Sequence, residues 1–555
     1  MLFRSYQLEQ QLHTAQNLLL NPPIPLAQPA PSSWPEHNAS ETGLSHLYDA
    51  LQQGRGEEIL HYFDLNQDHP HQGELNYLAG LALANRGSHE QALRCYEAAQ
   101  QHGFLTPYVL FNGGNACRAL AHSDDALRLF EEALDMFPGF SECRHNLALA
   151  LLDLQRHADA ERHLRLLLRD QPGYFQASFC LANLLRDHKR DREALEAYRL
   201  CLQYAPAYSE AWNNLGLTYG SLKQLSDAIA CYRQALTIDS DFKPSRQNLA
   251  QALVQEKNHQ EAVDEFATFA SLPSLTTQEQ VIALQGQIAC FLELDRYGDA
   301  LALADQQSDR SHQLMSRLHV LPVLYSSSDQ LAEIRQRWIK DASELYSLID
   351  GLTVDDHRWD MLYAHAWSLT NFYLAYQMQD DRPLQELYAG ILDRILRPRL
   401  NRFMQPLPMR DQCETRPIRV GVISPHLNNH NGSIWSLGWL QGISNNPGYQ
   451  IYCYNLGDTE DSGSHRFAEL GVYRHLPLRA EDPEPMLQQV LDDQLDILLF
   501  TDIGMHPASK ICSVLQLACV QVQGWGHPIT SGSKTIHYFL SGSGMEPAGN
   551  ESHYS

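Results

Sequence analysis

Residues 216–249 read GLTYGSLKQLSDAIACYRQALTIDSDFKPSRQNL, and this stretch is one period of a pattern that recurs every 34 residues. Within it Gly216 and Ala228 are small, whereas Tyr232 is bulky. A 34-residue period with small residues where two helices cross and a large one in the groove between them is typical of helix-pair repeats. Such a pair cannot bury its own apolar face, so neighbouring pairs stack into a superhelix. The stretch therefore predicts an α-solenoid.

Residues of the same size class occupy the same positions in six successive repeats. The alanine set comprises Ala92, Ala126, Ala160, Ala194, Ala228 and Ala262. A second small set comprises Gly80, Gly114, Ala148, Ala182, Gly216 and Ala250, and the bulky set comprises Tyr96, Phe130, Leu164, Tyr198, Tyr232 and Phe266. Pro138, Pro172 and Pro206 recur in one phase, where a helix has ended and a turn begins. This pattern resembles tetratricopeptide (TPR) repeats and assigns the first half of the chain to a binding surface.

The chain divides into four segments that differ in composition and in sequence periodicity. We predict an N-terminal helix and a proline-rich linker in residues 1–40, and the TPR superhelix in residues 41–308. Residues 309–416 keep helical spacing but lose the repeat, which predicts a helical connecting region. In residues 417–555 apolar runs alternate with helical stretches, which predicts a parallel, Rossmann-like α/β lobe. The runs that favour strands are 418–423, 450–454, 496–500, 520–523 and 538–540.

Composition restricts the partners and the compartment. The formal net charge of −25 argues against a nucleic-acid partner, because phosphate binding needs a basic stripe. No apolar run approaches the ~18 residues of a membrane span, so we expect no membrane association. The eleven cysteines include no C-x-x-C pair, which favours a reducing, cytoplasmic compartment and argues against disulfides and a zinc site. The Rossmann G-x-G-x-x-G and Walker motifs are absent, so a standard dinucleotide or NTPase site is not expected.

Reactive side chains follow the predicted strands. His426 and His430 lie in SPHLNNHNGS after the first strand, Asp502 and His506 lie in TDIGMH after residues 496–500, and His527 lies in GWGHPITSG after residues 520–523. In parallel α/β sheets, ligands gather beyond the carboxyl ends of the strands. These loops are therefore the candidate site.

Four motifs, VGVISPHLNNH, TDIGMHP, WGHPITSG and the closing MEP…HYS, stand in this order behind the TPR repeats. Together they resemble glycosyltransferase family 41, the O-GlcNAc transferases and their bacterial SPINDLY-type relatives. The upstream LTNFYLAYQ (residues 369–377) is similar to the same branch, and the resemblance covers residues 310–555. The chain ends at Ser555 inside a motif that continues in the relatives. The resemblance therefore implies one lobe of a two-lobed GT-B fold, with the second lobe and most nucleotide contacts missing.

The resemblance also implies an activity. Members of the family transfer a sugar, GlcNAc or a hexose, from a UDP-sugar to protein Ser or Thr hydroxyls, and the acceptor here could also be asparagine. No metal or other cofactor is expected, and the TPR groove is expected to hold the acceptor protein or peptide. The competing hypothesis is a non-catalytic TPR scaffold for protein–protein interaction, with the α/β segment as a relic transferase lobe.

Each candidate side chain has a functional and a structural interpretation. By resemblance, His430 lines the sugar and acceptor cleft, where an imidazole can orient or deprotonate a hydroxyl. The alternative is a histidine that caps the next helix or bonds its own backbone. His426 is a second catalytic candidate or a buttress of the loop. Asp502 and His506 border the cleft, or Asp502 bonds neighbouring backbone N–H groups in a turn. His527 faces the acceptor or serves a tight turn.

The repeats carry one further signal. Asn112, Asn146, Asn214 and Asn248 occupy one repeat position, which Cys180 interrupts. An asparagine amide has a donor and an acceptor, so it can pair with a peptide backbone of any sequence. By resemblance to the O-GlcNAc transferases, this ladder lines the inner groove and binds the acceptor. The alternative is that asparagine is simply common at this position of TPR units.

Overall fold

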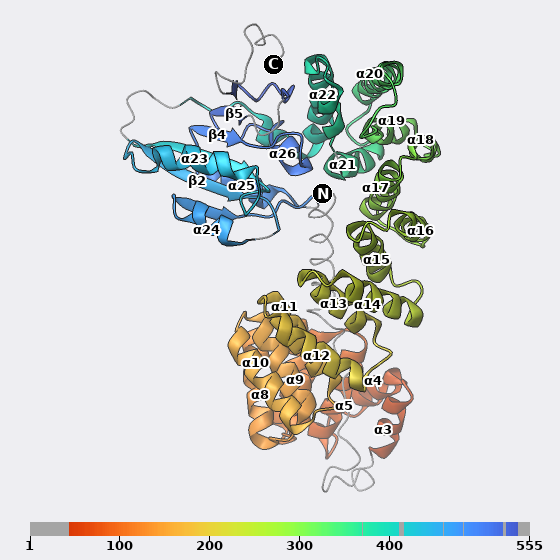
Figure 1. Cartoon of the computed structure of the whole chain (residues 1–555). Coiled ribbons are helices and arrows are strands. Elements are labelled where there is room, and N and C mark those ends of the chain that lie inside the picture. Colours follow the sequence, from red (N-terminus) through yellow and green to blue (C-terminus); the bar gives the residue numbers. More distant parts are fainter. Residues whose placement is uncertain are drawn as a thin grey trace. The chain divides into compact units, whose positions relative to one another are not determined.

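The computed structural model describes residues 44–368, 370–409, 416–458, 460–480, 482–524 and 529–541. Chain contacts divide these residues into one compact unit that ends at Ser240 and another that begins at Asp241, and each is described by itself (Figure 1). The helix and linker predicted for residues 1–40 lie outside the described residues, as do His527 and the closing MEP…HYS motif.

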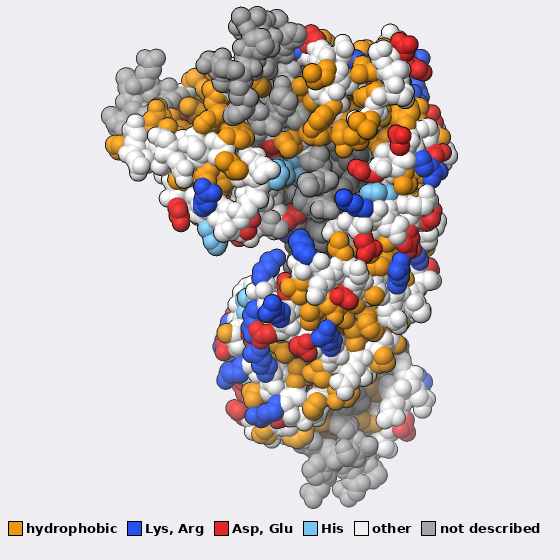
Figure 2. Space-filling model, viewed as in Figure 1, with side chains coloured by type: hydrophobic (Ala, Val, Ile, Leu, Met, Phe, Trp, Pro, Cys, Tyr) orange, Lys and Arg blue, Asp and Glu red, His pale blue; other side chains and the backbone are white. Residues whose placement is uncertain are grey.

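The unit that ends at Ser240 consists of antiparallel helix pairs. Within its described residues the helices are α3 (Ser45–Gln52), α4 (Gly56–Leu65), α5 (Gln72–Asn85), α6 (His89–Gln101), α7 (Pro107–Ala119), α8 (Ser123–Met136), α9 (Ser141–Asp153), α10 (His157–Asp170), α11 (Phe175–Asp187), α12 (Asp191–Tyr204), α13 (Ser209–Ser221) and α14 (Leu225–Ile238). The odd-numbered helices from α5 to α13 are buried over most of their length, whereas their even-numbered partners bury a narrower stripe. Acidic and basic side chains are interspersed over the outer surface of α8 to α12 (Figure 2).

The small and bulky sets meet inside each helix pair. A Cβ atom at Gly114 would stand 2.6 Å from the ring of Phe130, and one at Gly216 would stand 2.6 Å from the ring of Tyr232. These distances are far inside van der Waals contact, so the rings pack directly on the backbone of the facing helix. The prediction that small residues mark the helix crossings is confirmed at both positions.

The turn inside each repeat has a feature that composition does not reveal. Backbone with positive φ recurs at 34-residue spacing, at Gly87, Ala121, Gln155, Lys189, Lys223 and Lys257. Left-handed backbone is the common way to end a helix, and glycine adopts it with least strain. Only the first of these turns has a glycine, so the other turns hold side-chain-bearing residues in that conformation.

The unit that begins at Asp241 starts with helices and ends in a sheet. Its helices before the sheet are α15 (Lys243–Gln255), α16 (His259–Ala270), α17 (Thr277–Glu293), α18 (Tyr297–Asp305), α19 (Arg310–His319), α20 (Ser328–Asp350), α21 (Arg358–Ser368) and α22 (Arg382–Leu400), with 3-10 turns η1 (Phe372–Gln377) and η2 (Asn401–Met404). The capping box of Thr276 and Glu279 begins α17.

The sheet is wholly parallel, in the order β3-β2-β1-β4-β5-β6. Its strands are β1 (Ile418–Ser424), β2 (Tyr449–Asn455), β3 (Val472–His475), β4 (Ile497–Phe500), β5 (Val520–Gly524) and β6 (Tyr538–Leu540). The intervening helices are α23 (Ser433–Ser444), α24 (Ser462–Ala468), α25 (Glu484–Asp492) and α26 (Pro507–Cys512). Strand β3 and helix α24 were not predicted. The predicted fold class, a solenoid of helical repeats followed by a Rossmann-like α/β lobe, is confirmed.

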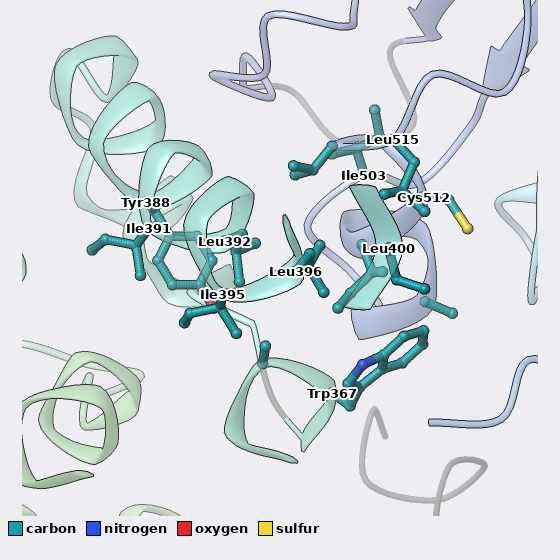
Figure 3. Packing of buried hydrophobic residues seen from close by; sticks show 14 of the residues in the cluster. Trp367, Tyr388, Ile391, Leu392, Ile395, Leu396, Leu400, Ile503, Cys512 and Leu515 are labelled. Atoms are coloured by element: carbon teal, nitrogen blue, oxygen red, sulfur yellow. The ribbon is translucent and has the colours of Figure 1, made fainter. Parts of the chain in front are cut away.

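Helices cover both faces of the sheet. On one face α23 and α24 contribute Leu437, Leu440 and Phe467 to a cluster with side chains of β1 and β2. The opposite face belongs to the largest core, which also takes in α20 to α22, α25 and α26. In Figure 3, Leu396 and Leu400 of α22 point toward Cys512 and Leu515, beside Trp367 of α21. The helical region before the sheet therefore shares one hydrophobic core with the lobe.

Candidate active site at the carboxyl edge of the sheet

Strands β1 and β4 lie side by side at the centre of the sheet, where the order of the strands reverses. The chain runs from β1 outward through β2 to β3, and then returns to β4 on the other side of β1. Ile423 at the end of β1 pairs with Phe500 at the end of β4. The loops that follow these two strands therefore leave the sheet from neighbouring positions. Such a switch point is where parallel α/β sheets bind ligands.

The loop after β1 is held by the segment that precedes and begins α24. Asp461 caps this helix and also accepts the backbone N–H of Asn429, at 3.1 and 3.0 Å from its two oxygens. Ser464 donates to the carbonyl of Leu427 over 2.8 Å. A Cβ atom at Gly463 would stand 2.4 Å from the backbone of Asn429, so only glycine allows this close approach. These contacts fix the loop that carries His426 and His430.

The loop after β4 is held by α26 and by the segment after α21. His506 is the N-cap residue of α26, and its Nδ1 accepts the N–H of Ala508 over 3.1 Å. Thr370, within LTNFYLAYQ, donates to the carbonyl of Gly504 over 2.7 Å. Gly504 has a φ of +94°, a conformation that favours glycine. The motif upstream of the sheet therefore supports the candidate site directly.

Three histidines and one aspartate come together between these loops. The rings of His426 and His430 stack with centroids 4.4 Å apart and planes inclined by 20°. The ring of His506 meets His426 edge-on at 6.1 Å. His426 Nε2 lies 3.7 Å from Asp502 Oδ2. The structure thus places four of the predicted site residues in one cluster, drawn from two loops.

Burial sets the charge state of this cluster. It raises the pKa of Asp502 to about 7, although hydrogen bonds from Ser509 and other hydroxyls act in the opposite direction. Burial lowers the pKa of His426 to about 4 and that of His506 to about 3. It also lowers the pKa of His430, and the neighbouring His426 adds to this effect. At neutral pH the histidines are therefore uncharged and Asp502 is near its midpoint, which is the range that suits acid–base chemistry.

Local hydrogen bonds decide which ring nitrogen carries the proton. Gly432 donates its N–H to His430 Nδ1 over 3.1 Å, and Ala508 does the same to His506 Nδ1. A neutral ring that accepts at Nδ1 carries its proton on Nε2. His430 and His506 therefore present Nε2–H as a donor. His430 therefore bonds the backbone of its own loop, as its structural interpretation predicted. This bond uses Nδ1 and leaves Nε2 to interact with a ligand.

The alternative role for Asp502, a turn residue that bonds backbone N–H groups, differs from what is observed. Its Oδ1 accepts from the hydroxyls of Ser509, at 3.0 Å, and Thr501, at 3.4 Å. Among the described residues no group of three or more His, Cys, Asp or Glu side chains is arranged to hold a metal ion. Imidazole and carboxyl groups such as those of the cluster can exchange protons and form hydrogen bonds with hydroxyl groups.

The asparagine ladder of the repeats is buried. Asn112, Asn146 and Asn214 are at most 2% exposed. Asn146 donates to Asn115 over 2.6 Å, and Asn214 donates to Asn183 over 3.1 Å. Asn112 donates to the carbonyl of Tyr108 and to the hydroxyl of Tyr77. Asn248, on α15 of the other unit, is 4% exposed. The bond to Tyr108 lies within α7, whereas the others join helices of neighbouring repeats, and a role of the ladder in binding a peptide backbone stays a prediction.

Sequence reasoning missed a buried lysine next to the site. Lys510 of α26 is 2% exposed and donates to the carbonyl of Ser531, at 2.6 Å, and to Gln385 Oε1, at 3.3 Å. Burial lowers its pKa to about 7. A Cβ atom at Gly532 would stand 2.1 Å from the backbone of Gln385, so the loop after β5 presses on α22 where Lys510 bonds. The local sequence does not indicate that Lys510 is buried, because a lone lysine ordinarily lies on the surface.

Comparison with models of known protein families identifies the repeats. Residues 122–178 and residues 209–242 each match a family model described as tetratricopeptide repeat. The repeats are tetratricopeptide repeats. Repeats of this kind form concave surfaces that bind other proteins. No curated protein sequence matches the chain. Among the described helices, none combines the length and apolar character that crossing a bilayer requires.

Solved structures give weaker likenesses. A mutant of the Thermobaculum terrenum O-GlcNAc transferase is 17% identical with a TM-score of 0.36, over 68% of this chain and 56% of that one. YrrB, a TPR protein with an unusual peptide-binding site, is 19% identical with a TM-score of 0.29, over 36% of this chain and 99% of its own. MamA from Desulfovibrio magneticus is 24% identical with a TM-score of 0.29, over 30% and 94%. These scores lie below 0.5, and no functional assignment follows from them.

Proposed function

We propose that this chain belongs to a protein glycosyltransferase that transfers a sugar from a UDP-sugar to protein hydroxyls, with the TPR repeats binding the acceptor protein. The motifs SPHLNNHNGS, TDIGMHP and LTNFYLAYQ support the proposal through their resemblance to family 41. The α/β lobe would then be one half of a GT-B fold. The donor is a UDP-sugar, and neither a metal nor another cofactor is required.

The observation that carries the proposal is the cluster at the switch point of the sheet. His430, His426, His506 and Asp502 gather from two loops that the sequence separates by about seventy residues, at the edge where such sheets bind ligands. A scaffold has no need for four titratable side chains there, and burying ionisable groups costs stability. In the proposed reaction, His430 would use its Nε2–H to orient the acceptor hydroxyl.

The second candidate is a non-catalytic TPR scaffold with a relic lobe. Its supporting observation is that the tetratricopeptide repeats account for binding by themselves. The two candidates differ in one respect: a scaffold captures its partner without changing the partner's mass.

The experiment is a screen of UDP-sugars. The chain, reconstituted with the second GT-B lobe that the resemblance implies, is expressed with and without a His430→Ala substitution, and bacterial lysate proteins are incubated with UDP-GlcNAc, UDP-glucose or UDP-galactose. Mass spectrometry of the lysate proteins should reveal one hexose or N-acetylhexosamine on Ser or Thr in the wild type only. If UDP-sugars leave every protein unmodified while the repeats still capture partners, the scaffold replaces the transferase.

A further inference from the structure

Two buried polar atoms face each other in the site. Asp502 Oδ2 and His426 Nε2 lie 3.7 Å apart, and neither makes a hydrogen bond to any residue in the described part of the chain. The Asp502 side chain is 5% exposed and that of His426 is 21% exposed. A buried polar atom without a partner is costly, so such atoms are expected where a ligand or a shared proton completes them.

The distance between the two atoms and their hydrogen-bonding character indicate which ligand group could bind both. One oxygen atom placed ~2.8 Å from each would bond both, with an angle of ~80° at the oxygen. A hydroxyl fits, because it donates to a carboxylate and accepts from an imidazole N–H at the same time. A phosphate or carbonyl oxygen has no proton to donate to an ionised carboxylate. When Asp502 is ionised, the two atoms therefore fit an alcohol better than an anion.

The surroundings leave Oδ2 as the proton-binding atom. Ser509 and Thr501 donate to Oδ1 and occupy that side of the carboxyl group, and the hydroxyl of Ser424 also interacts with the carboxyl group and lowers its pKa. The titratable groups that face it are His426 and His430 from the loop after β1, and the buried Cys512 of α26. His506, from the loop after β4, contacts the ring of His426, which in turn lies next to the Asp502 carboxyl group. The histidines are neutral at pH 7 because burial lowers their pKa, so a proton on the carboxyl group is not opposed by a fixed positive charge.

We infer that Asp502 and His426 form one proton-sharing pair that binds the acceptor hydroxyl and takes its proton. The inference rests on the proposed transferase function for the identity of the hydroxyl. As the acceptor oxygen bonds to the anomeric carbon of the sugar, its proton passes to Asp502 Oδ2. The bond from that carbon to the diphosphate breaks, and its electrons stay on UDP. The proton is then released from Asp502 to solvent after the products have left.

The test follows the proton itself and needs no transfer activity. Infrared difference spectra between pH 5 and pH 9 separate a protonated carboxyl group from a carboxylate. Wild-type chain is compared with Asp502→Asn, His426→Gln and Asp492→Asn, the last being an exposed carboxylate of the same lobe. The wild type minus Asp502→Asn should show a protonated carboxyl band that disappears with a midpoint near pH 7. In His426→Gln the midpoint should fall by at least about half a pH unit, because the amide N–H always donates to the carboxylate.

Each outcome decides one part of the inference. A protonated band that is absent at pH 6 in wild type, or equally lost in Asp492→Asn, shows that Asp502 is ionised and overturns the pair. An unchanged midpoint in His426→Gln removes His426 from it. Circular dichroism checks that each variant is folded. Because the titration is independent of sugar transfer, a normal titration in a chain that transfers no sugar would leave the pair intact and remove only its assignment to an acceptor hydroxyl.

Discussion

The repeats and the sheet lobe bury polar side chains in different ways. In the repeats, asparagine amides pair with one another across neighbouring helices, as Asn146 does with Asn115. In the lobe, the buried Asp502 and Lys510 are ionisable, and each makes its hydrogen bonds to neutral groups. Neutral amide pairs join helices at any pH, whereas an ionisable group without an opposite charge costs stability and is typical of functional sites. Under the proposed function, the repeats bind the acceptor protein and the lobe carries out the chemistry.

The largest effect is expected from His430. In a chain that transfers sugar, His430→Ala should lower kcat by about 10²–10⁴-fold, because the variant loses the Nε2–H that orients the acceptor hydroxyl. His465→Ala is the matched control, since His465 is an exposed histidine of α24 in the same lobe. Near wild-type turnover in His430→Ala would make this histidine a structural residue of its loop.

Lys510 should make the stability of the chain depend on pH. Its pKa of about 7 in the folded state lies below the ordinary lysine value, so the unfolded chain binds the proton more tightly. Stability should therefore rise as pH increases from about 7 to 10.5, and the cost of burial should be complete below pH 7. Lys510→Met should flatten this slope and stabilise the unit at pH 7 by on the order of a few kcal/mol.

Urea unfolding at several pH values measures the effect of Lys510. Lys534→Met is the control, because Lys534 is exposed and lies close by in the sequence. Equal slopes for wild type and Lys510→Met would mean that the buried amine is charged in the folded protein. The contrast between the asparagine pairs of the repeats and the ionisable groups of the lobe would then lose one of its two supports.

The packing of the repeats can be tested within one helix. A Cβ atom at Gly216 would stand 2.6 Å from the Tyr232 ring, whereas nothing lies within 4 Å of one at Gly220. Gly216→Val should therefore destabilise the unit by about 1–3 kcal/mol relative to Gly220→Val, because it overpacks the crossing of α13 and α14. Thermal unfolding compares the two variants, and equal stabilities would show that small residues do not define the crossings.

The smallest effect is expected at the turns. Lys223 has a φ of +63°, where glycine is less strained. Lys223→Gly should stabilise the repeats by about 0.5–1 kcal/mol, whereas Lys223→Ala keeps the Cβ atom and should not. Urea unfolding measures both variants, and a loss of stability in Lys223→Gly would mean that the lysine side chain contributes more than the strain costs.

The repeats could be predicted because one contact recurs. The Gly114–Phe130 packing appears again between Gly80 and Tyr96 and between Gly216 and Tyr232, at multiples of 34 residues, so the spacing reveals it. The strands β1, β2, β4, β5 and β6 were predicted from the sequence, whereas β3 was missed because its four residues, VYRH, are half-buried at one side of the sheet. The left-handed turns could not be predicted either, because residues such as Lys223 carry no glycine signal.

The candidate site could be predicted only as far as topology allows. The rule for parallel sheets brings the loops of His430 and Asp502 to one edge, and both were predicted there. The contacts that organise the loops depend on partners far apart in the chain, such as Thr370 with Gly504, which are 134 residues apart. The pairing of His426 with Asp502, and the burial of Lys510, follow from the same distant packing.

The central claim is that the loops after β1 and β4 act as one site for sugar transfer. A double-mutant cycle of His430→Ala and Asp502→Asn on the transfer rate tests it most directly, because groups that act in one step are not additive. The account predicts that each single variant loses rate and that the double variant loses markedly less than the product of the two losses. A double variant whose loss equals that product, or single variants that keep the wild-type rate, would contradict it.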